Sequence, residues 1–337
     1  MTILPNSPEF VGAVNGTWQQ HMKWAIRNAA DLAQRLDLPL QSVCPVQSSG
    51  QFPLFVPLPY LERIEPGNPN DPLLRQVLPS FEENAVDSGS ADPVSESDFV
   101  LTPGLLQKYQ GRALLVVNGT CAIHCRYCFR RHYPYNDVAA GQESWREPLA
   151  TIVRDESISE VILSGGDPLT LVDDSLEALF GEIEAIDHVS RIRIHTRLPI
   201  VIPQRVTQRL LQLISKSRLD VVVVIHCNHA NEIDLSVATK LQELKPIVSA
   251  LLNQSVLLRG VNDDVKSLTA LSQRLIETGT LPYYLHQLDP VQGAMHFEAS
   301  IEKGLQLIES MRAQLPGYLV PRYVREVPGE TAKTILA

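Results

Sequence analysis

Cys121-Ala-Ile-His-Cys125-Arg-Tyr-Cys128 is the stretch of this 337-residue chain that decides its fold and chemistry. Three thiolates at this spacing can bind three irons of one four-iron, four-sulfur cluster and leave the fourth iron without a protein ligand. Such an iron can bind a substrate or cofactor directly. A zinc site is the weaker interpretation, because zinc normally takes four ligands in two pairs. The remaining cysteines, Cys44 and Cys227, form no second pair.

The composition excludes several classes of protein. The net charge of −9 disfavours a nucleic-acid-binding surface, which is normally basic. No apolar run approaches the roughly 20 residues of a membrane span, and residues 1–10 lack the apolar core of a signal peptide. We therefore expect a cytoplasmic enzyme with neither a nucleic-acid nor a membrane partner. We also expect a homo-oligomer, although nothing in the composition fixes the oligomer.

The first hundred residues are expected to form a mainly helical and irregular N-terminal cap, residues 1–100. Apolar residues recur at helical spacing from Thr17 to Leu36 and predict one amphipathic helix. A proline-rich stretch, Pro39–Pro72, then precludes long elements. The acidic segment Ser80–Phe99 predicts a loop or a short irregular connection.

From Arg112 onward, short β-rich runs alternate with helix-like stretches. The predicted strands are 113–117, 160–163, 191–195, 220–226, 255–258 and 282–286, and the predicted helices are 173–186, 204–216, 232–244 and 264–278. This alternation predicts parallel βα units with both sheet faces covered. Periodicity alone leaves a partial barrel and a doubly wound open sheet as alternatives, and the cysteine stretch favours the barrel.

The cysteine spacing, with Tyr127 before the third cysteine, resembles the signature of the radical S-adenosylmethionine (SAM) enzymes. The resemblance implies an α/β fold with a partial (β/α)6 TIM-like barrel over residues 101–315. It also implies that a [4Fe-4S] cluster on Cys121, Cys125 and Cys128 binds SAM through its open iron.

Gly165-Gly166-Asp167, at the end of the second predicted strand, resembles the glycine-rich SAM motif of that class. The glycines allow close approach of the backbone to a ligand, and Asp167 offers a carboxylate to an ammonium group. The cofactor-binding residues that the resemblance implies for SAM or a second cofactor are Tyr127, Ser164, Gly165, Gly166, Asp167, His226 and Gln254.

Three further segments narrow the resemblance to the lysine 2,3-aminomutase family. Residues 119–131, 253–263 and 283–333 resemble that family in order and spacing. The resemblance implies an isomerase that converts L-lysine to β-lysine through a 5'-deoxyadenosyl radical and an imine of pyridoxal phosphate (PLP), with an external electron donor. Within the family the chain is similar to the short bacterial form. That form makes β-lysine for modification of translation elongation factor P by a lysyl-tRNA-synthetase-like ligase.

The family's PLP-bearing lysine matches Lys333, in a C-terminal tail expected over residues 316–337. Arg112 matches a family arginine that contacts PLP. One departure concerns this tail, because only Pro328-Gly329 remains of the glycine-rich run that commonly precedes the lysine.

The implied substrate has a carboxylate and, some distance away, an ε-ammonium, so its pocket needs an arginine at one end and acids at the other. Arg130 matches the family arginine for the carboxylate, which a planar guanidinium can bind with two parallel hydrogen bonds. Asp289 and Glu326 match the two acids for the ε-ammonium. Glu326 is the second departure, because the family more often has aspartate there, and its longer side chain is expected to change the depth of the pocket.

Two alternatives stay open. The first is a radical SAM and PLP aminomutase for another amino acid, against which the acidic pair argues. The second is a non-catalytic iron–sulfur protein that keeps the barrel as a scaffold. The second alternative predicts neither SAM cleavage nor absorption from covalently bound PLP.

Overall fold

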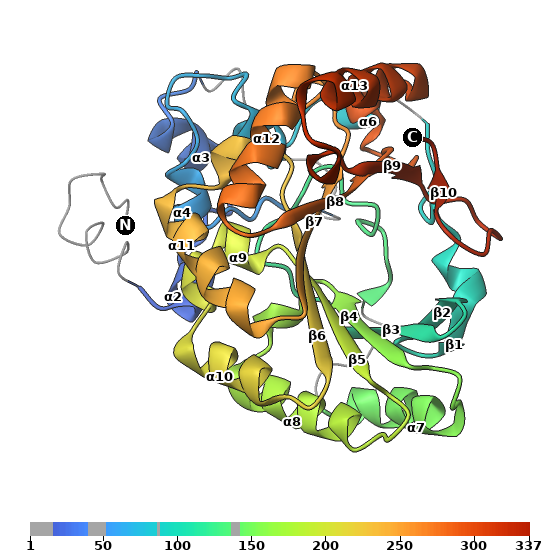
Figure 1. Ribbon diagram of the computed structural model, residues 1–337. Helices are drawn as coiled ribbons and strands as arrows, with labels where there is room; N and C mark the ends of the chain where they lie inside the picture. The colour runs from blue at the N-terminus through green and yellow to red at the C-terminus, as the bar shows by residue number, and fades with distance from the viewer. Residues whose placement is uncertain (1–15, 40–51, 86–87, 136–141) are drawn as a thin grey trace.

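A single sheet of ten strands forms the centre of the computed structural model, which describes residues 16–39, 52–85, 88–135 and 142–337. The strands follow one another in space in the same order as in the sequence (Figure 1). They are β1 (Val100–Thr102), β2 (Leu105–Tyr109), β3 (Arg112–Asn118), β4 (Glu160–Gly165), β5 (Arg191–Thr196), β6 (Asp220–His226), β7 (Ala250–Val256), β8 (Leu281–His286), β9 (Arg322–Arg325) and β10 (Thr334–Ile335).

The strands from β3 to β9 are all parallel, and antiparallel strands flank them at both ends. A doubly wound sheet reverses its strand order at a switch point. No reversal occurs among the described strands, so this alternative is wrong. The fold is a mixed α/β sheet wound in one direction.

Two strand predictions differ from the structure. The fifth predicted strand, 255–258, is centred too late, because β7 runs from Ala250 to Val256 and carries the polar pair Asn253-Gln254 in its middle. The predicted strand was placed on the apolar run that follows this pair, because apolar residues indicate a buried strand more clearly than polar ones do. A seventh parallel strand, β9, was not predicted. It has only four residues and takes its register from β8, where Tyr284 pairs with Arg322.

The longer helices lie around the outside of the sheet (Figure 1). They are α7 (Arg146–Arg154), α8 (Asp173–Glu184), α10 (Gln208–Lys216), α11 (Leu235–Leu244), α12 (Val265–Glu277) and α13 (Ile301–Gln314). In α8 the buried residues Leu176, Leu179, Phe180 and Ile183 recur at helical spacing, so one stripe of the helix faces the core. Within the described residues, no helix combines the length and apolar character that crossing a membrane requires.

The single helix predicted over Thr17–Leu36 is two helices, α2 (Trp18–Lys23) and α3 (Ala29–Arg35). Between them Ile26 forms an isolated β-bridge with Val56, with hydrogen bonds of 2.8 and 3.0 Å. This pairing with a distant segment interrupts the helix. The Asn28 side chain then caps α3 by accepting a hydrogen bond from Ala30 N. The remaining short helices before the sheet are α4 (Leu58–Leu61), α5 (Pro72–Arg75) and α6 (Glu82–Ala85).

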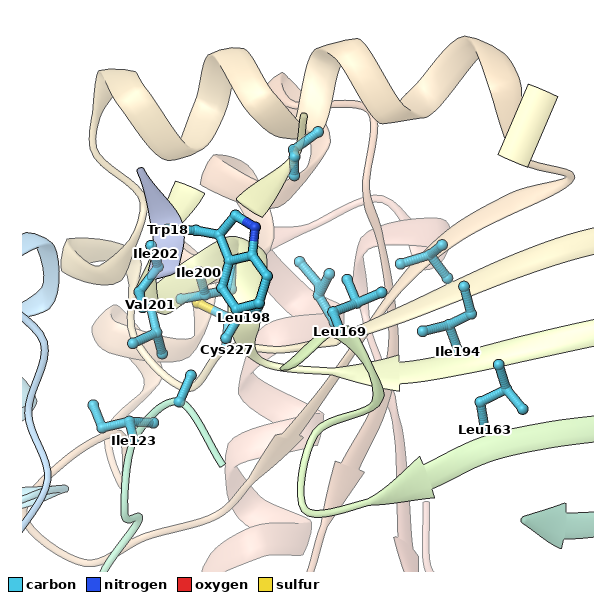
Figure 2. Packing of buried hydrophobic residues seen from close by; sticks show 14 of the residues in the cluster. Trp18, Ile123, Leu163, Leu169, Ile194, Leu198, Ile200, Val201, Ile202 and Cys227 are labelled. Carbon is cyan, nitrogen blue, oxygen red and sulfur yellow. The ribbon is translucent and has the colours of Figure 1, made fainter. Parts of the chain in front are cut away.

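The N-terminal segment and the sheet share one hydrophobic core. Trp18 of α2 belongs to the same buried cluster as Ile123 of the cysteine stretch and Leu198, which begins α9 (Leu198–Val201) (Figure 2). The Arg205 guanidinium also lies 4.9 Å from the centre of the Trp18 ring. This packing holds the N-terminal residues against the carboxyl ends of the strands. The predictions about residues 1–10 and Cys44 concern residues outside the described part of the chain.

Side chains connect the two ends of the sheet. Lys108 on β2 forms an ion pair of 2.8 Å with Glu326, the residue after β9, and the Tyr109 hydroxyl donates a hydrogen bond to the same carboxylate. These residues are 218 and 217 positions apart in the sequence. The sheet therefore curves until β2 and the end of β9 come within reach of each other.

Candidate active site

The cysteine stretch leaves the carboxyl end of β3 and is held from the N-terminal side. Glu83 of α6 accepts a hydrogen bond of 2.7 Å from Arg126 Nε and one of 2.8 Å from Arg131. Arg126 also donates to the carbonyl of Phe52 at 2.9 Å. These contacts lie on either side of Cys128, so they set the course of the loop independently of any bound group.

The three cysteines of this loop are partly buried and form no disulfide. Burial raises the pKa of the Cys121 thiol and raises that of Cys128 to about 12. Thiols in such a site lose their protons when iron binds. Among the described residues, no three His, Cys, Asp or Glu side chains converge to hold one metal ion. The sequence spacing of the three cysteines fits a [4Fe-4S] cluster, in which each thiolate binds a different iron.

Gly165 and Gly166 allow a close approach of another backbone segment of the same chain, at Asn118 and Thr120. A Cβ on Gly165, which has φ of +121°, would lie 2.4 Å from the carbonyl oxygen of Asn118, and one on Gly166 would lie 2.3 Å from that of Thr120. Gly166 N also donates to Asn118 O at 2.8 Å. The glycines therefore allow the end of β4 to pack against the segment that leads into the cysteines. The ligand contact expected from the sequence stays a prediction.

The carboxylate of Asp167 is committed to contacts within the protein. Its oxygens accept hydrogen bonds from the hydroxyl of Thr196 at 2.7 Å and from the backbone N–H groups of Leu169, Arg197 and Leu198 at 2.7 to 3.0 Å. Burial raises the pKa of this carboxyl, and these donors oppose the rise. Asp167 thus joins the loops after β4 and β5. Its role toward an ammonium group stays a prediction.

Tyr127 and His226, predicted separately, lie together. The Tyr127 hydroxyl is 2.8 Å from His226 Nε2 and accepts a hydrogen bond of 2.7 Å from Asn228. Burial lowers the pKa of His226 to about 3, so its imidazole is neutral. Gln254 lies beside His226 on the neighbouring strand. Its half-buried side chain has no hydrogen-bond partner in the described part of the chain and can donate to a ligand.

Lys333 lies just before β10 and forms an ion pair with Glu326. Burial alone would raise the pKa of Glu326, but Lys333 and the donors Lys108 and Tyr109 lower it to about 2. Asp289 follows β8 in the same region, and burial raises its pKa to about 7 although Lys333 opposes the rise. The two acids therefore differ. Glu326 is ionised and paired with cations, whereas Asp289 titrates near neutrality.

Arg130 is buried, at 6% exposure, and its partner was not predicted. Its Nε and Nη2 atoms donate to the two carboxylate oxygens of Glu96 at 2.7 and 2.6 Å. Its Nη1 donates to the hydroxyl of Ser164 at 2.9 Å. Glu96 lies in the short helix η2 (Glu96–Phe99). In this structure it already occupies the edge of the guanidinium on which two parallel hydrogen bonds were expected to hold a substrate carboxylate.

The surroundings of Lys333 fit PLP. Burial, with the charges of Arg193 and Lys333, lowers the pKa of His195. Burial and the charge of Lys333 together lower the pKa of His286 to about 3. The Nε2 atoms of these two neutral imidazoles are buried without a partner within the described residues. Arg112 lies over the Tyr109 ring at 4.6 Å and has no acidic partner among these residues, so its charge is available to a phosphate.

Several residues at this site were not among those predicted from the sequence. They are Glu83, Glu96, Lys108, Tyr109, Arg197 and Glu232. Arg197 alone had a signal, because it directly follows a predicted strand, where a parallel barrel collects its functional groups. Glu83 and Glu96 precede the predicted barrel, and Lys108 and Tyr109 precede its first predicted strand. Glu232 begins a predicted helix. Polar side chains at such positions are usually solvated.

A three-cysteine loop at the carboxyl end of the first parallel strand defines a radical SAM enzyme. Consistent with this class, the family model "4Fe-4S single cluster domain" matches residues 110–224. The L-lysine 2,3-aminomutase of Haemophilus influenzae is 44% identical over all of both chains. That of Escherichia coli is 47% identical over 85% of this chain and 83% of its own. The L-lysine 2,3-aminomutase of Clostridium subterminale is 34% identical over 93% of this chain and 76% of its own.

The chain therefore belongs to the L-lysine 2,3-aminomutase family. It is an isomerase that moves an amino group within one molecule, and its cofactors are a [4Fe-4S] cluster, SAM and PLP. Among solved structures, a radical SAM methyltransferase from Sphaerobacter thermophilus covers 68% of this chain and 71% of its own. It has a TM-score of 0.44 and 17% identity, a similarity too low to define the fold.

Proposed function

We propose that this protein converts L-lysine to β-lysine and that the product serves the modification of translation elongation factor P. Support comes from one arrangement: Lys333 forms an ion pair with Glu326, and its charge acts on Asp289 and on His195. The charge of Arg130 acts on the same histidine. An amine that can carry PLP thus shares one site with an arginine for a carboxylate and with acids for a second ammonium. The ten-stranded sheet is in this proposal a partial (β/α)6 radical SAM barrel with an N-terminal cap.

The substrate is oriented by its two ends. Arg130 takes the carboxylate, with Glu96 and Ser164 keeping the guanidinium in one orientation. Since Glu96 already holds the Nε side, the substrate carboxylate binds the remaining Nη edge or displaces Glu96. Asp289 and Glu326 take the ε-ammonium, because a buried ammonium without an acid would be strongly destabilised.

Glu326 is shared between two cations, Lys333 and Lys108. In the structure the Lys333 ammonium occupies Glu326. With PLP carried on Lys333 as an imine, this amine would no longer be a free ammonium paired with Glu326, and the ε-ammonium of the substrate could pair with Glu326 there. The matched charges favour a substrate with a second ammonium over one with a neutral or acidic side chain.

Bound together, the cluster, SAM and PLP supply an electron, a carbon radical and a carrier for the migrating amino group. In our proposal Cys121, Cys125 and Cys128 hold the cluster, and Gln254, His226 and Tyr127 lie on the SAM side. The N-terminal segment keeps water away from the carboxyl ends of the strands, which protects reactive species. The domain boundaries, the electron donor, the ligase partner, the oligomeric state and the cytoplasmic location stay predictions from the sequence.

Product analysis tests the proposal directly. Protein reconstituted anaerobically with iron and sulfide, then given SAM, PLP and dithionite, is expected to convert L-lysine to β-lysine. Chromatography of the amino acids measures the product. Parallel incubations with L-glutamate and L-ornithine are the controls for the side chain. Conversion of either control in preference to lysine would contradict the role of the acidic pair, and no conversion of any amino acid would favour a non-catalytic protein.

The pH dependence of binding tests Asp289. A carboxyl with a pKa of about 7 is roughly one tenth ionised at pH 6 and nine tenths at pH 8. An ammonium with a pKa of about 10.4 stays charged over this range. PLP-free protein is therefore expected to bind 6-aminohexanoate, which has both charged ends but no α-amine, about tenfold more tightly at pH 8 than at pH 6. Calorimetry measures the affinity. The Asp289→Asn variant should show no such rise, and an equal rise in that variant would assign it to another group.

A further inference from the structure

Arg197 is a buried arginine to which neither the sequence nor the family comparison assigns a role in the reaction. It directly follows β5 and is 7% exposed. Its backbone N–H donates to Asp167 Oδ2 at 2.7 Å, which fixes its main chain next to the loop after β4. Its side chain therefore extends from a fixed point toward the cysteine loop.

The guanidinium of Arg197 contacts a cysteine sulfur. Nη1 donates to Cys125 Sγ at 2.7 Å, and Nη2 donates to Gln76 Oε1 at 2.7 Å and to Glu232 Oε2 at 2.8 Å. The guanidinium also lies 5.7 Å from the centre of the Tyr127 ring. Because Glu232 and Gln76 already engage Nη2, Nη1 is left to donate to the sulfur.

Glu232 holds the guanidinium in this orientation. Its Oε1 atom accepts hydrogen bonds from Asn228 N at 2.9 Å and from His229 N at 3.1 Å, and its other oxygen accepts from Arg197. The carboxylate is completely buried. A fully bonded, buried carboxylate has little freedom to move, so the arginine that it binds is held in place as well.

We propose that Arg197 sets the reduction potential of the iron–sulfur cluster by donating a hydrogen bond to the sulfur of Cys125. The inference rests on the proposed placement of the cluster on Cys121, Cys125 and Cys128. Reduction transfers one electron from an external one-electron donor to the cluster, and no bond to the protein forms or breaks. The cluster and its thiolates gain one negative charge in this step. A cationic N–H donor at a ligating sulfur stabilises that charge and raises the potential.

Glu232 acts in the opposite direction. Its negative charge lies against Nη2 of the guanidinium, whereas Cys125 accepts from Nη1, and it partly offsets the positive charge of Arg197. Loss of the Arg197 charge therefore lowers the reduction potential, whereas loss of the Glu232 charge raises it. An ion pair that only stabilised the fold would change stability in both variants and leave the potential unchanged.

Redox titration of the reconstituted protein, followed by electron paramagnetic resonance without SAM, tests the inference. Relative to wild type, Arg197→Gln is expected to have a lower midpoint potential and Glu232→Gln a higher one. Arg205→Gln is the matched control, because Arg205 is also a buried arginine, pairs with Asp173 at 2.9 Å and contacts no cysteine among the described residues. Its midpoint should equal that of wild type.

Iron content separates failure of this inference from failure of the proposed function. Wild-type protein that binds fewer than four irons would contradict the cluster site itself. Variants that keep four irons and titrate at the wild-type midpoint would overturn the role of Arg197 while leaving the cluster site intact. If Arg197→Gln loses its iron, Glu232→Gln decides, and an unshifted or lowered midpoint in that variant overturns the proposal.

Discussion

Replacing Lys333 by alanine is expected to abolish the formation of β-lysine, with a loss of roughly a thousandfold or more. Lys333 is the amine that our proposal gives to PLP, and a covalent carrier cannot work without its attachment point. Chromatography of the products measures the loss of activity. After gel filtration, the variant should also lack the visible absorption of covalently bound PLP.

Two variants separate the amine from its charge. Lys333→Arg keeps a cation beside Glu326 but does not bind PLP covalently, so it should be as inactive as Lys333→Ala. Lys108→Ala removes the other cation paired with Glu326, which lies 2.8 Å from the carboxylate. Because Lys108 does not carry the cofactor, this variant should retain bound PLP. An active Lys333→Ala protein would remove this lysine from the reaction.

Replacing Cys125 by alanine is expected to have a comparable effect for a different reason. With one of three thiolates missing, the cluster loses a protein ligand at a second iron, and the iron content after reconstitution should fall well below four per chain. Cleavage of SAM under dithionite should then be undetectable. Iron analysis and chromatography of 5'-deoxyadenosine measure these two quantities.

Cys227→Ala is the control for the loss of a buried thiol. Cys227 lies in the hydrophobic core, and its thiol donates only a weak hydrogen bond, of 3.4 Å, to the carbonyl of His229. This variant should bind as much iron as wild type. Because Glu83 holds Arg126 and Arg131 independently of iron, Cys125→Ala should also keep its circular dichroism spectrum. Full iron content in Cys125→Ala would contradict the ligand assignment.

The periodicity of the sequence was sufficient to predict most strands in the parallel part of the sheet. Five of the six predicted strands overlap β3, β4, β5, β6 and β8 with bounds within two residues. These strands are apolar runs with clear breaks, and such a pattern is visible over a few residues. The prediction failed where a partner far away in the sequence decides the local structure. Ile26 leaves a helical pattern to pair with Val56, and β9 forms on the edge of β8.

For the candidate site, the sequence brought out residues of unusual type or spacing. It could not show which hydrogen-bond and ion-pair partners these residues have in the folded protein. Arg130 was predicted to bind a substrate carboxylate, and in the structure it also binds Glu96. Asp167 was predicted to offer a carboxylate to an ammonium group, and in the structure it accepts hydrogen bonds from four donors. Glu96 lies in an acidic segment that resembles an ordinary solvated loop, so nothing in its neighbours marks it as a partner of Arg130.

The sequence by itself therefore determined the alternation of strands and helices, the three-cysteine loop and the lysine near the C-terminus, because each depends on neighbouring residues. Only the tertiary structure decided which charges meet. Curvature of the sheet brings Glu326 to Lys108, and the loop after β5 brings Arg197 to Cys125 across 72 positions. Ion pairs and hydrogen bonds act over a few ångströms, so their partners are defined by distance in the folded chain and not by spacing along it.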